Sequence, residues 1–246
     1  MIFKIENNKK VGNPHIKILY PGKAMGTGDS GFASIGRIDH ASLPPGAFIA
    51  MHPHINDEIL SYFRSGKVKH TDSAGFSEYI TPSRLMLMKA GHSFFHEEKI
   101  LDDSELLEGL QIFIRPKSKD LKPEVTFYEL PEVYSKNKWR LLAGPNTEAP
   151  LRLTSDTWIY DIQITGENEI ELPLLSYNNL TFLLYIFQGS AVVNNLMTLS
   201  KGESIILKDE ENISIHSSNS EMVLFVTDES APFFDGGMYS GNQNNS

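Results

Sequence analysis

The chain has 246 residues, of which 40% are hydrophobic, so it can bury one large β domain or two smaller ones. Its formal net charge of -9 argues against general nucleic-acid binding, because that requires a basic surface. It has no cysteine, which excludes disulfides and thiolate metal sites, and no apolar run of about 18 residues that could span a bilayer. The first residues contain no apolar leader, so we expect a cytoplasmic protein that does not contact membranes.

Short apolar segments of strand length recur along the chain, separated by Gly, Pro, Asn or Asp. In the first half they occupy residues 48–51, 58–63, 67–71, 76–80, 85–88, 92–98 and 110–114. Residues 115–131 are rich in Lys and Pro, which predicts a connection between two units. The second set occupies residues 139–142, 158–164, 180–187, 191–193, 196–199, 204–207, 213–216 and 222–227. Many short strands at close spacing are typical of an all-β sandwich or barrel.

The two halves share a rhythm of an apolar strand, a Gly turn, a hairpin and a third apolar segment. The Gly turns are Ser65-Gly66 and Gln188-Gly189. This weak repetition indicates duplication. It predicts an N-terminal domain over residues 1–130 and a C-terminal domain over residues 131–234. Residues 235–246 are rich in Gly, Asn and Ser, and we expect a disordered tail there.

Two pairs of metal-competent side chains lie in the first half: His52 with His54, and His96 with Glu98. Residues i and i+2 of a β-strand point to the same face, so each pair can bind one ion from one strand. If the two strands face each other, three imidazoles and one carboxylate surround a single ion. A lone His-x-His is weak evidence, but two such pairs predict a metal site suited to Fe, Mn, Ni, Cu or Zn.

Other titratable residues have alternative interpretations. Glu58 either orients an imidazole through its free N–H or faces solvent, and His92 either lines the cavity mouth or lies on a surface turn. Glu97 alternates away from the ligand face, so we expect it to be exposed. The remaining histidines have no partner at ligand spacing and are expected to be structural or surface residues: His15, His40, His70 and His216. The second half is therefore expected to hold no metal ligands.

These residues resemble known sequence motifs. Gly46, His52-Pro53-His54, Glu58 and Gly66 resemble the first cupin motif, and Pro82, Ala90-Gly91 and His96-Glu97-Glu98 resemble the second. With the His-Thr-Asp-Ser-Ala-Gly hairpin at residues 70–75, they resemble the pirin family, which includes bacterial pirin-like quercetin 2,3-dioxygenases. The resemblance spans residues 30–228 and is most specific between residues 46 and 98.

The resemblance implies an all-β bicupin: two tandem jelly-roll β-barrels with short helices and a metal only in the N-terminal one. The metal implied is most commonly Fe(II), with other divalent ions tolerated. The implied partners are dioxygen and a small aromatic substrate such as quercetin or a related flavonol. Pirin itself is a nuclear transcriptional co-regulator, which leaves a protein partner open. The implied metal ligands are His52, His54, His96 and Glu98.

Three departures from the family pattern border the cavity: Ile55-Asn56-Asp57 after the second His, Arg84 in place of Gly, and His92 in place of a small residue or Arg. They affect the expected substrate rather than the metal. The first hypothesis is an iron-dependent dioxygenase with Glu98 as general base. The second is a non-enzymatic, metal-dependent regulatory module, which a closed, small or acidic cavity would favour. The third is a cupin enzyme acting on another small metabolite, which a polar pocket would favour.

Overall fold

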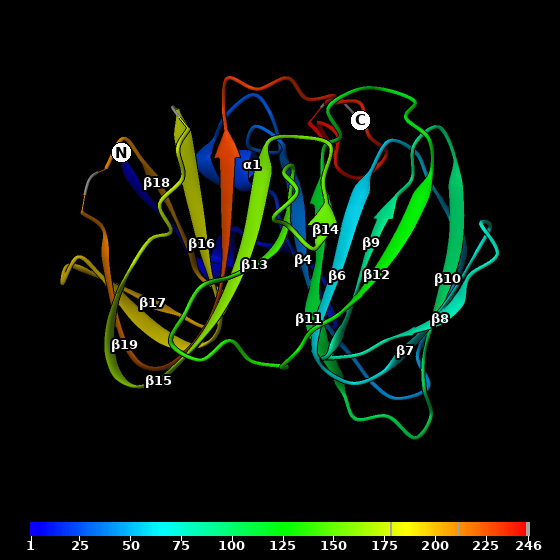
Figure 1. Ribbon diagram of the computed structural model, residues 1–246, viewed down its shortest axis with the longest axis horizontal. Coiled ribbons are helices and arrows are strands. Elements are labelled where there is room, and N and C mark those ends of the chain that lie inside the picture. The colour runs from blue at the N-terminus through cyan, green and yellow to red at the C-terminus, as the bar shows by residue number, and fades with distance from the viewer. Residues whose placement is uncertain (178, 211, 245–246) are drawn as a thin grey trace. The chain divides into compact units, whose positions relative to one another are not determined.

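The computed structural model describes residues 1–177, 179–210 and 212–244. Regular structure is almost entirely β, and the helical pieces are α1 (Pro21–Met25) and the 3-10 helix η1 (Asn7–Lys9). The prediction of an all-β protein is thus confirmed (Figure 1). Within the described ranges, no helix is long and apolar enough to cross a membrane.

The chain divides into two compact units. The N-terminal barrel consists of Lys10–Val133, Leu153–Ser155 and the residues from Pro232 onward. The C-terminal barrel consists of Met1–Lys9, Tyr134–Arg152 and Asp156–Ala231. Each unit contains its own sheets and its own buried apolar cluster, as expected for two tandem barrels.

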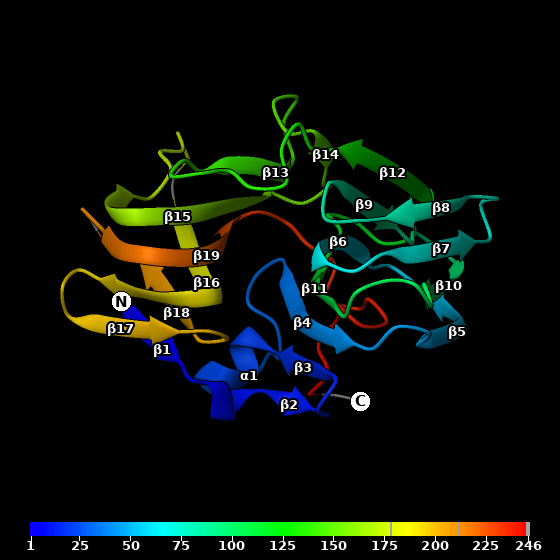
Figure 2. The ribbon, with the colours of Figure 1, turned by 90° about the horizontal axis from the view of Figure 1, so that it is seen from below.

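The N-terminal barrel contains two antiparallel sheets. Their strands are β2 (Val11–Gly12), β3 (Ile16–Leu19), β4 (Ile35–Leu43), β5 (Phe48–His54), β6 (Glu58–Ser65), β7 (Val68–Asp72), β8 (Ser77–Ile80), β9 (Arg84–Lys89), β10 (Phe94–Ile100), β11 (Leu107–Ile114) and β12 (Glu124–Glu129). The larger sheet has the order β12-β9-β6-β11-β4-β3-β2, and the smaller sheet has the order β5-β10-β7-β8 (Figure 2). Phe63 and Met86 of the larger sheet share one buried cluster with Phe94 of the smaller sheet. Strand β12 lies within the stretch that its Lys and Pro content predicts to be a connection.

The C-terminal barrel is built from one sheet. Its strands are β1 (Ile2–Ile5), β13 (Arg140–Gly144), β14 (Leu151–Arg152), β15 (Thr157–Glu171), β16 (Leu180–Val193), β17 (Met197–Ser200), β18 (Ser204–Lys208) and β19 (Ser214–Asp228). The strand order is β1-β18-β16-β19-β15-β13-β14, and β17 pairs with β16. Register shifts interrupt the long strands β15, β16 and β19, as expected where a sheet bends around a core. Trp158, Ile186 and Leu224 belong to that core.

The units interleave along the chain, which differs from the expected boundaries at residues 130 and 234. Strand β1 pairs with β18, with Ile2 opposite Leu207, so the first nine residues belong to the C-terminal barrel. The structure also differs from the expected disordered tail. Residues 235–244 pack into the N-terminal barrel, where Ser240 is fully buried, because their backbone finds partners there; residues 245 and 246 lie outside the described residues.

Candidate metal centre

Neighbouring strands of the smaller sheet bring the predicted ligands together. Strand β5 carries His52 and His54, and its neighbour β10 carries His96 and Glu98. His52 lies directly opposite His96, and His54 lies opposite Phe94. Residues opposite one another in an antiparallel pair point to the same face. The alternation along each strand therefore directs the three imidazoles to the same side of the sheet.

Strand β5 is an edge strand, which explains the proline between its two histidines. Among the strands that the structure describes, it pairs with β10 alone. Pro53 lacks an N–H donor, and an edge strand tolerates that loss. The register places His96 opposite His52 but Glu98 opposite Ile49, so β5 has one extra residue at this point. Such bulges commonly re-aim side chains next to functional sites.

The three imidazoles form a compact cluster. Their ring centroids are 4.4–4.9 Å apart, and the Nε2 atoms of His54 and His96 are 2.9 Å apart. One ring nitrogen of each of the three lies within 4.8 Å of the others. His54 and His96 are buried, whereas His52 is partly exposed. The cluster is therefore inside the barrel with one edge toward the surface.

Hydrogen bonds assign the proton on two of these rings to Nδ1. The Nδ1 atom of His52 donates to the carbonyl of Ala50 at 2.8 Å. The Nδ1 atom of His54 donates to Oδ2 of Asp57 at 3.3 Å. A neutral imidazole carries one proton, so each Nε2 atom is left with a free lone pair. Both rings are thus in the tautomer that binds a metal through Nε2.

His96 reaches the same tautomer through a residue that sequence reasoning placed elsewhere. Its Nδ1 atom lies 3.2 Å from Nδ1 of His70, and Nε2 of His70 lies 2.7 Å from Oδ2 of Asp72. Asp72 accepts the Nε2 proton of His70, so Nδ1 of His70 is an acceptor. It therefore accepts the Nδ1 proton of His96 and leaves a lone pair on Nε2 of His96.

Burial favours the neutral form of His96 and of two histidines near it. Burial, followed by the proximity of His54, His52 and His70, lowers the pKa of His96 to about 2. Burial also lowers the pKa of His52 and, against the opposing effect of Asp72, that of His70. Neutral imidazole is the form that binds metal ions. The site is therefore ready for a cation at neutral pH.

Glu98 is buried beside this cluster, but on the other side of the His96 ring. Its Oε2 atom accepts a hydrogen bond from Gln111 at 2.8 Å, and its Oε1 atom is 3.9 Å from Nδ1 of His96. It groups within 4.8 Å with His70 and His96 rather than with His52 and His54. Burial raises the pKa of Glu98 to about 7, although the Gln111 hydrogen bond opposes this. The structure thus brings three of the four predicted ligands together. The fourth, Glu98, lies on the opposite side of the His96 ring.

A small cavity borders Glu98 inside the barrel. Its volume is about 20 Å³, which is room for one water molecule. Asp39 and Gln111 line it together with apolar side chains such as Phe63. Within the described part of the chain, Oδ1 of Asp39 and Oε1 of Glu98 are buried without a hydrogen-bond partner. The cavity is therefore small and mostly apolar, with two buried carboxyl groups in its lining.

The remaining predicted residues are placed as follows. Glu58 is buried in β6 and accepts a hydrogen bond from the backbone N–H of Thr154 at 3.0 Å, so neither interpretation of it is correct. His92 is exposed on the turn before β10, as in its surface interpretation. Glu97 is only half-buried rather than fully exposed. Three further histidines are exposed or partly buried, as expected of structural or surface residues: His15, His40 and His216.

His70 is the functional candidate that sequence reasoning missed. Its sequence context predicts a structural or surface histidine without a metal-site role, but it is fully buried against His96. The available signal was His70-Thr71-Asp72, a third pair of ligand-type side chains at i and i+2. Strand β7 pairs with β10 so that Asp72 lies opposite His96 and His70 lies opposite Glu98. The three pairs therefore occupy three adjacent strands.

The donor set fits a divalent cation. One ring nitrogen of each of the three imidazoles lies within 4.8 Å of the others, and across the His96 ring Oε1 of Glu98 is buried without a hydrogen-bond partner among the described residues. Two nitrogens bound about 2.1 Å from one ion at a right angle would be about 3 Å apart. The Nε2 separation of 2.9 Å between His54 and His96 agrees with this value. Imidazole with carboxylate suits first-row divalent metals.

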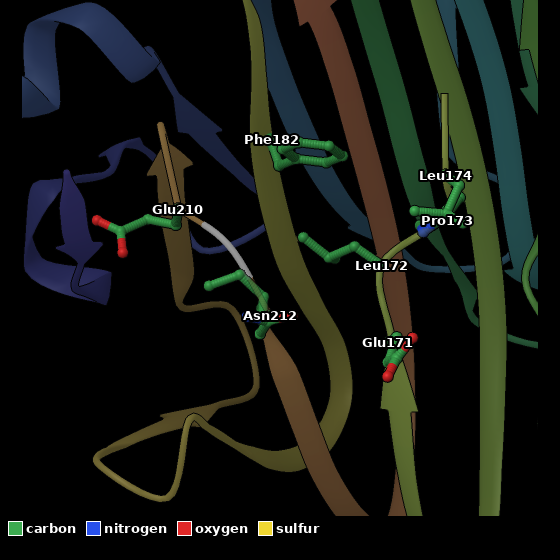
Figure 3. A pocket seen from close by; sticks show the side chains of 8 residues that line it. Glu171, Leu172, Pro173, Leu174, Phe182, Glu210 and Asn212 are labelled. Carbon is green, nitrogen blue, oxygen red and sulfur yellow. The ribbon is translucent and has the colours of Figure 1, made fainter. Parts of the chain in front are cut away.

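The C-terminal barrel contains an open pocket of different character. Its volume is about 350 Å³, and Figure 3 shows Phe182 and Leu172 directed toward each other within it. Glu171 and Glu210 add carboxylates, and the amino terminus pairs with Glu210 at 2.6 Å. The lining contains no histidine among the described residues. This pocket therefore lacks the imidazole ligands of the N-terminal barrel.

Comparison with known families gives a match in each half of the chain. Residues 26–114 match the family described as Pirin, and residues 141–227 match the family described as Quercetinase C-terminal cupin domain. The quercetin 2,3-dioxygenase of Escherichia coli strain K12 is 26% identical over 197 residues, which are 79% of this chain and 83% of that protein. The putative quercetin 2,3-dioxygenase ZMO1337 of Zymomonas mobilis is 28% identical over 188 residues, which are 75% of this chain and 78% of that protein.

Solved structures show the same fold. The crystal structure of YhhW from Escherichia coli superposes with a TM-score of 0.76 at 22% identity and covers 92% of this chain and 97% of its own. A nickel(II) complex of the same bacterial pirin has a TM-score of 0.76 at 21% identity, covering 93% of this chain and 99% of its own. The expected arrangement of two tandem cupin barrels is therefore confirmed.

Proposed function

Because the chain belongs to the pirin family of tandem cupins, we propose that it is a metal-dependent dioxygenase whose site lies in the N-terminal barrel. The proposed substrates are dioxygen and a flavonol such as quercetin, as the names of the related proteins suggest. The proposed general base is Glu98. The proposed metal ligands are His52, His54, His96 and Glu98.

One observation carries this proposal: each of the three imidazoles has its Nδ1–H directed to an acceptor, and one ring nitrogen of each lies within 4.8 Å of the others. The proposed ion is Fe(II), and Mn, Ni, Cu and Zn suit the same donors. The nickel(II) complex of the related bacterial pirin supports a divalent ion in this fold. Glu98 would complete the ligand set after a change of its side-chain rotamer, since it now faces Nδ1 of His96.

The residues of the site divide the chemistry between them. When bound, a divalent ion would supply Lewis-acid activation of a substrate hydroxyl and, for a redox metal, electron transfer. Glu98 takes up the hydroxyl proton, because a carboxyl with a pKa of about 7 exchanges protons readily at neutral pH. Glu98 would act as base when it is released from the ion into the rotamer seen here, in which Gln111 binds Oε2 and leaves Oε1 to accept the proton.

The first experiment measures dioxygen uptake with quercetin by protein of known metal content. We expect uptake that is proportional to bound metal. His52→Ala removes one ligand and should abolish both metal retention and uptake. Fully metal-loaded protein that consumes no dioxygen with quercetin would reject the flavonol substrate. Wild-type protein that retains no divalent metal would reject the metal site itself.

A second experiment isolates the base. Glu98→Gln keeps the size of the side chain but removes its basicity. We expect turnover to fall by about 10²–10⁴-fold, while metal content falls much less because three imidazoles remain. Glu97→Gln is the matched control, since Glu97 lies on the opposite face of β10. Equal losses of turnover and metal from Glu98→Gln would show that Glu98 is only a ligand.

The small cavity favours a second candidate function. The cavity of about 20 Å³ beside Glu98 holds no more than one water molecule, and the carboxyl groups of Asp39 and Glu98 line it together with apolar side chains. A small cavity with two carboxyl groups next to the histidine cluster supports a metal-dependent regulatory module or an enzyme for a small polar metabolite. Metal binding without dioxygen uptake, together with binding of a protein partner that depends on His52, would support the regulatory module.

A further inference from the structure

The C-terminal segment, residues 234–244, lies directly against one of the proposed metal ligands. The ring of Tyr239 lies 5.0 Å from the ring of His54, centroid to centroid, at an interplanar angle of 56°. Tyr239 also packs 6.0 Å from the ring of Phe113, and the guanidinium of Arg37 lies 5.2 Å from its centroid. The segment therefore covers one face of the His54 imidazole.

A single carboxyl group joins this segment to the metal site. Asp57 is 1% exposed, and its Oδ2 atom accepts the Nδ1 proton of His54 at 3.3 Å. Its Oδ1 atom accepts the backbone N–H groups of Tyr239 at 3.0 Å and Ser240 at 2.7 Å. The group that fixes the tautomer of His54 is thus itself held by the C-terminal segment. Movement of the segment would release Asp57 and, with it, the orientation of His54.

The N-terminal barrel binds this segment through hydrogen bonds and close backbone packing. The Nε atom of fully buried Arg115 donates to the carbonyl of Ser240 at 2.9 Å, while Asp29 binds both guanidinium NH2 groups at 2.6 Å. A Cβ atom on Gly36 would lie 2.3 Å from the carbonyl oxygen of Ser240. A Cβ atom on Gly237 would lie 2.5 Å from the carbonyl oxygen of Asn56. The segment and the barrel therefore pack closely, because each has a glycine where a side chain would clash with the backbone of the other.

We propose that the C-terminal segment sets the metal affinity of the N-terminal barrel, with Tyr239 and Asp57 as positioning residues for His54. This inference rests on the metal site of the proposed function. Asp57 and Asn56 also belong to the stretch in which the sequence departs from the pirin pattern after its second histidine. The departure therefore provides an attachment point for the segment. Outer partners of metal-binding histidines typically change metal affinity by about 10–100-fold.

The test measures the affinity of the full-length chain for Co(II) by competition with a chromophoric chelator. We expect Tyr239→Ala to weaken Co(II) binding by about tenfold or more. Tyr239→Phe keeps the ring over His54 and should bind Co(II) as wild type does. Asp57→Asn offers His54 an amide donor in place of an acceptor, so it should weaken binding and shift the visible absorption of bound Co(II). A purely structural role would leave the spectrum of the bound ion unchanged.

Two further variants address folding. Gly36→Ala displaces Ser240, whose N–H binds Asp57, without changing the side chain of Asp57 or His54. A chain ending at Phe233 removes the segment entirely. Both should weaken Co(II) binding while circular dichroism retains the β spectrum. If the truncated chain does not fold, the Co(II) affinities of Tyr239→Ala, Asp57→Asn and Gly36→Ala still test the role of the segment.

The outcomes separate this inference from the proposed function. Wild-type affinity that is lost in His96→Ala but unchanged in Tyr239→Ala and Asp57→Asn would overturn the positioning role and leave the metal site standing. Wild-type protein that binds no Co(II), or binds it equally well in His96→Ala, would overturn both. Weakened binding in Tyr239→Ala and Asp57→Asn, with Tyr239→Phe unchanged, would establish the role of the segment.

Discussion

At the residue scale, the metal centre depends on the partners of its histidines as much as on the histidines themselves. Each proposed imidazole ligand has a different acceptor for its Nδ1 proton: the carbonyl of Ala50, the carboxyl of Asp57 and the ring of His70. The third is unusual because it is an imidazole, and it can accept only because Asp72 holds the proton on its other nitrogen. The orientation of His96 therefore depends on two residues of β7.

This dependence predicts that His70→Ala weakens divalent-metal binding by about 10–100-fold. Removal of the ring leaves the buried Nδ1–H of His96 without its acceptor, which favours other ring orientations. Isothermal titration with Ni(II) measures the effect. His15→Ala is the control, because His15 is an exposed histidine of the same barrel. Unchanged affinity in His70→Ala would show that His70 only fills space.

At the scale of elements, the site exists because β10 lies between β5 and β7 in one sheet. The larger sheet runs beside it, and the turn after β6 leads the chain from the larger sheet to the smaller one. Gly66 forms this turn with a φ of +81°, a conformation that side chains other than glycine rarely adopt. A Cβ atom there would lie 2.7 Å from the Cα atom of Leu107, the first residue of β11.

Gly66→Ala is expected to lower the free energy of unfolding by about 1–3 kcal/mol, because both the backbone conformation and the contact with β11 become unfavourable. Gly26→Ala is a matched control: its φ is +75°, and nothing lies within 4 Å of its added Cβ atom. Urea denaturation of the two variants measures the free energy of unfolding of each. The difference between them gives the cost of the steric clash with Leu107, because both share the cost of a positive φ. Equal losses in the two variants would show that the contact with Leu107 relaxes without cost.

At the scale of the whole molecule, buried carboxyl groups make stability depend on pH. Burial raises the pKa of Glu58, and the hydrogen bond from Thr154 only partly opposes this. The folded state then binds the Glu58 proton more tightly than the unfolded state does. Stability is therefore lost as pH rises from the unfolded pKa through the raised folded pKa.

Glu58→Gln removes this ionisation. We expect the variant to gain stability relative to the wild type as pH rises from 4 to 8, in thermal unfolding followed across that range. Glu105→Gln, on an exposed loop, should show no such trend. A difference between Glu58→Gln and the wild type that stays constant with pH would contradict a raised pKa for Glu58.

Much of the site follows from local sequence. The alternation of side chains along a strand is a local property, so His52 with His54 and His96 with Glu98 could be recognised as same-face pairs. The edge position of β5 likewise follows from Pro53. The same rule applied to His70 and Asp72 would have identified the third pair. The repeated short apolar segments of strand length were enough to predict an all-β fold.

Only the tertiary structure decided which of these strands are neighbours and what covers them. Glu98, on the Nδ1 side of His96, is held there by a hydrogen bond from Gln111 of another sheet. Composition predicts disorder for the C-terminal segment, yet its backbone binds Asp57 across 183 residues of sequence. The physical reason is common to these cases: buried hydrogen-bond partners that are distant along the chain are absent from any local pattern.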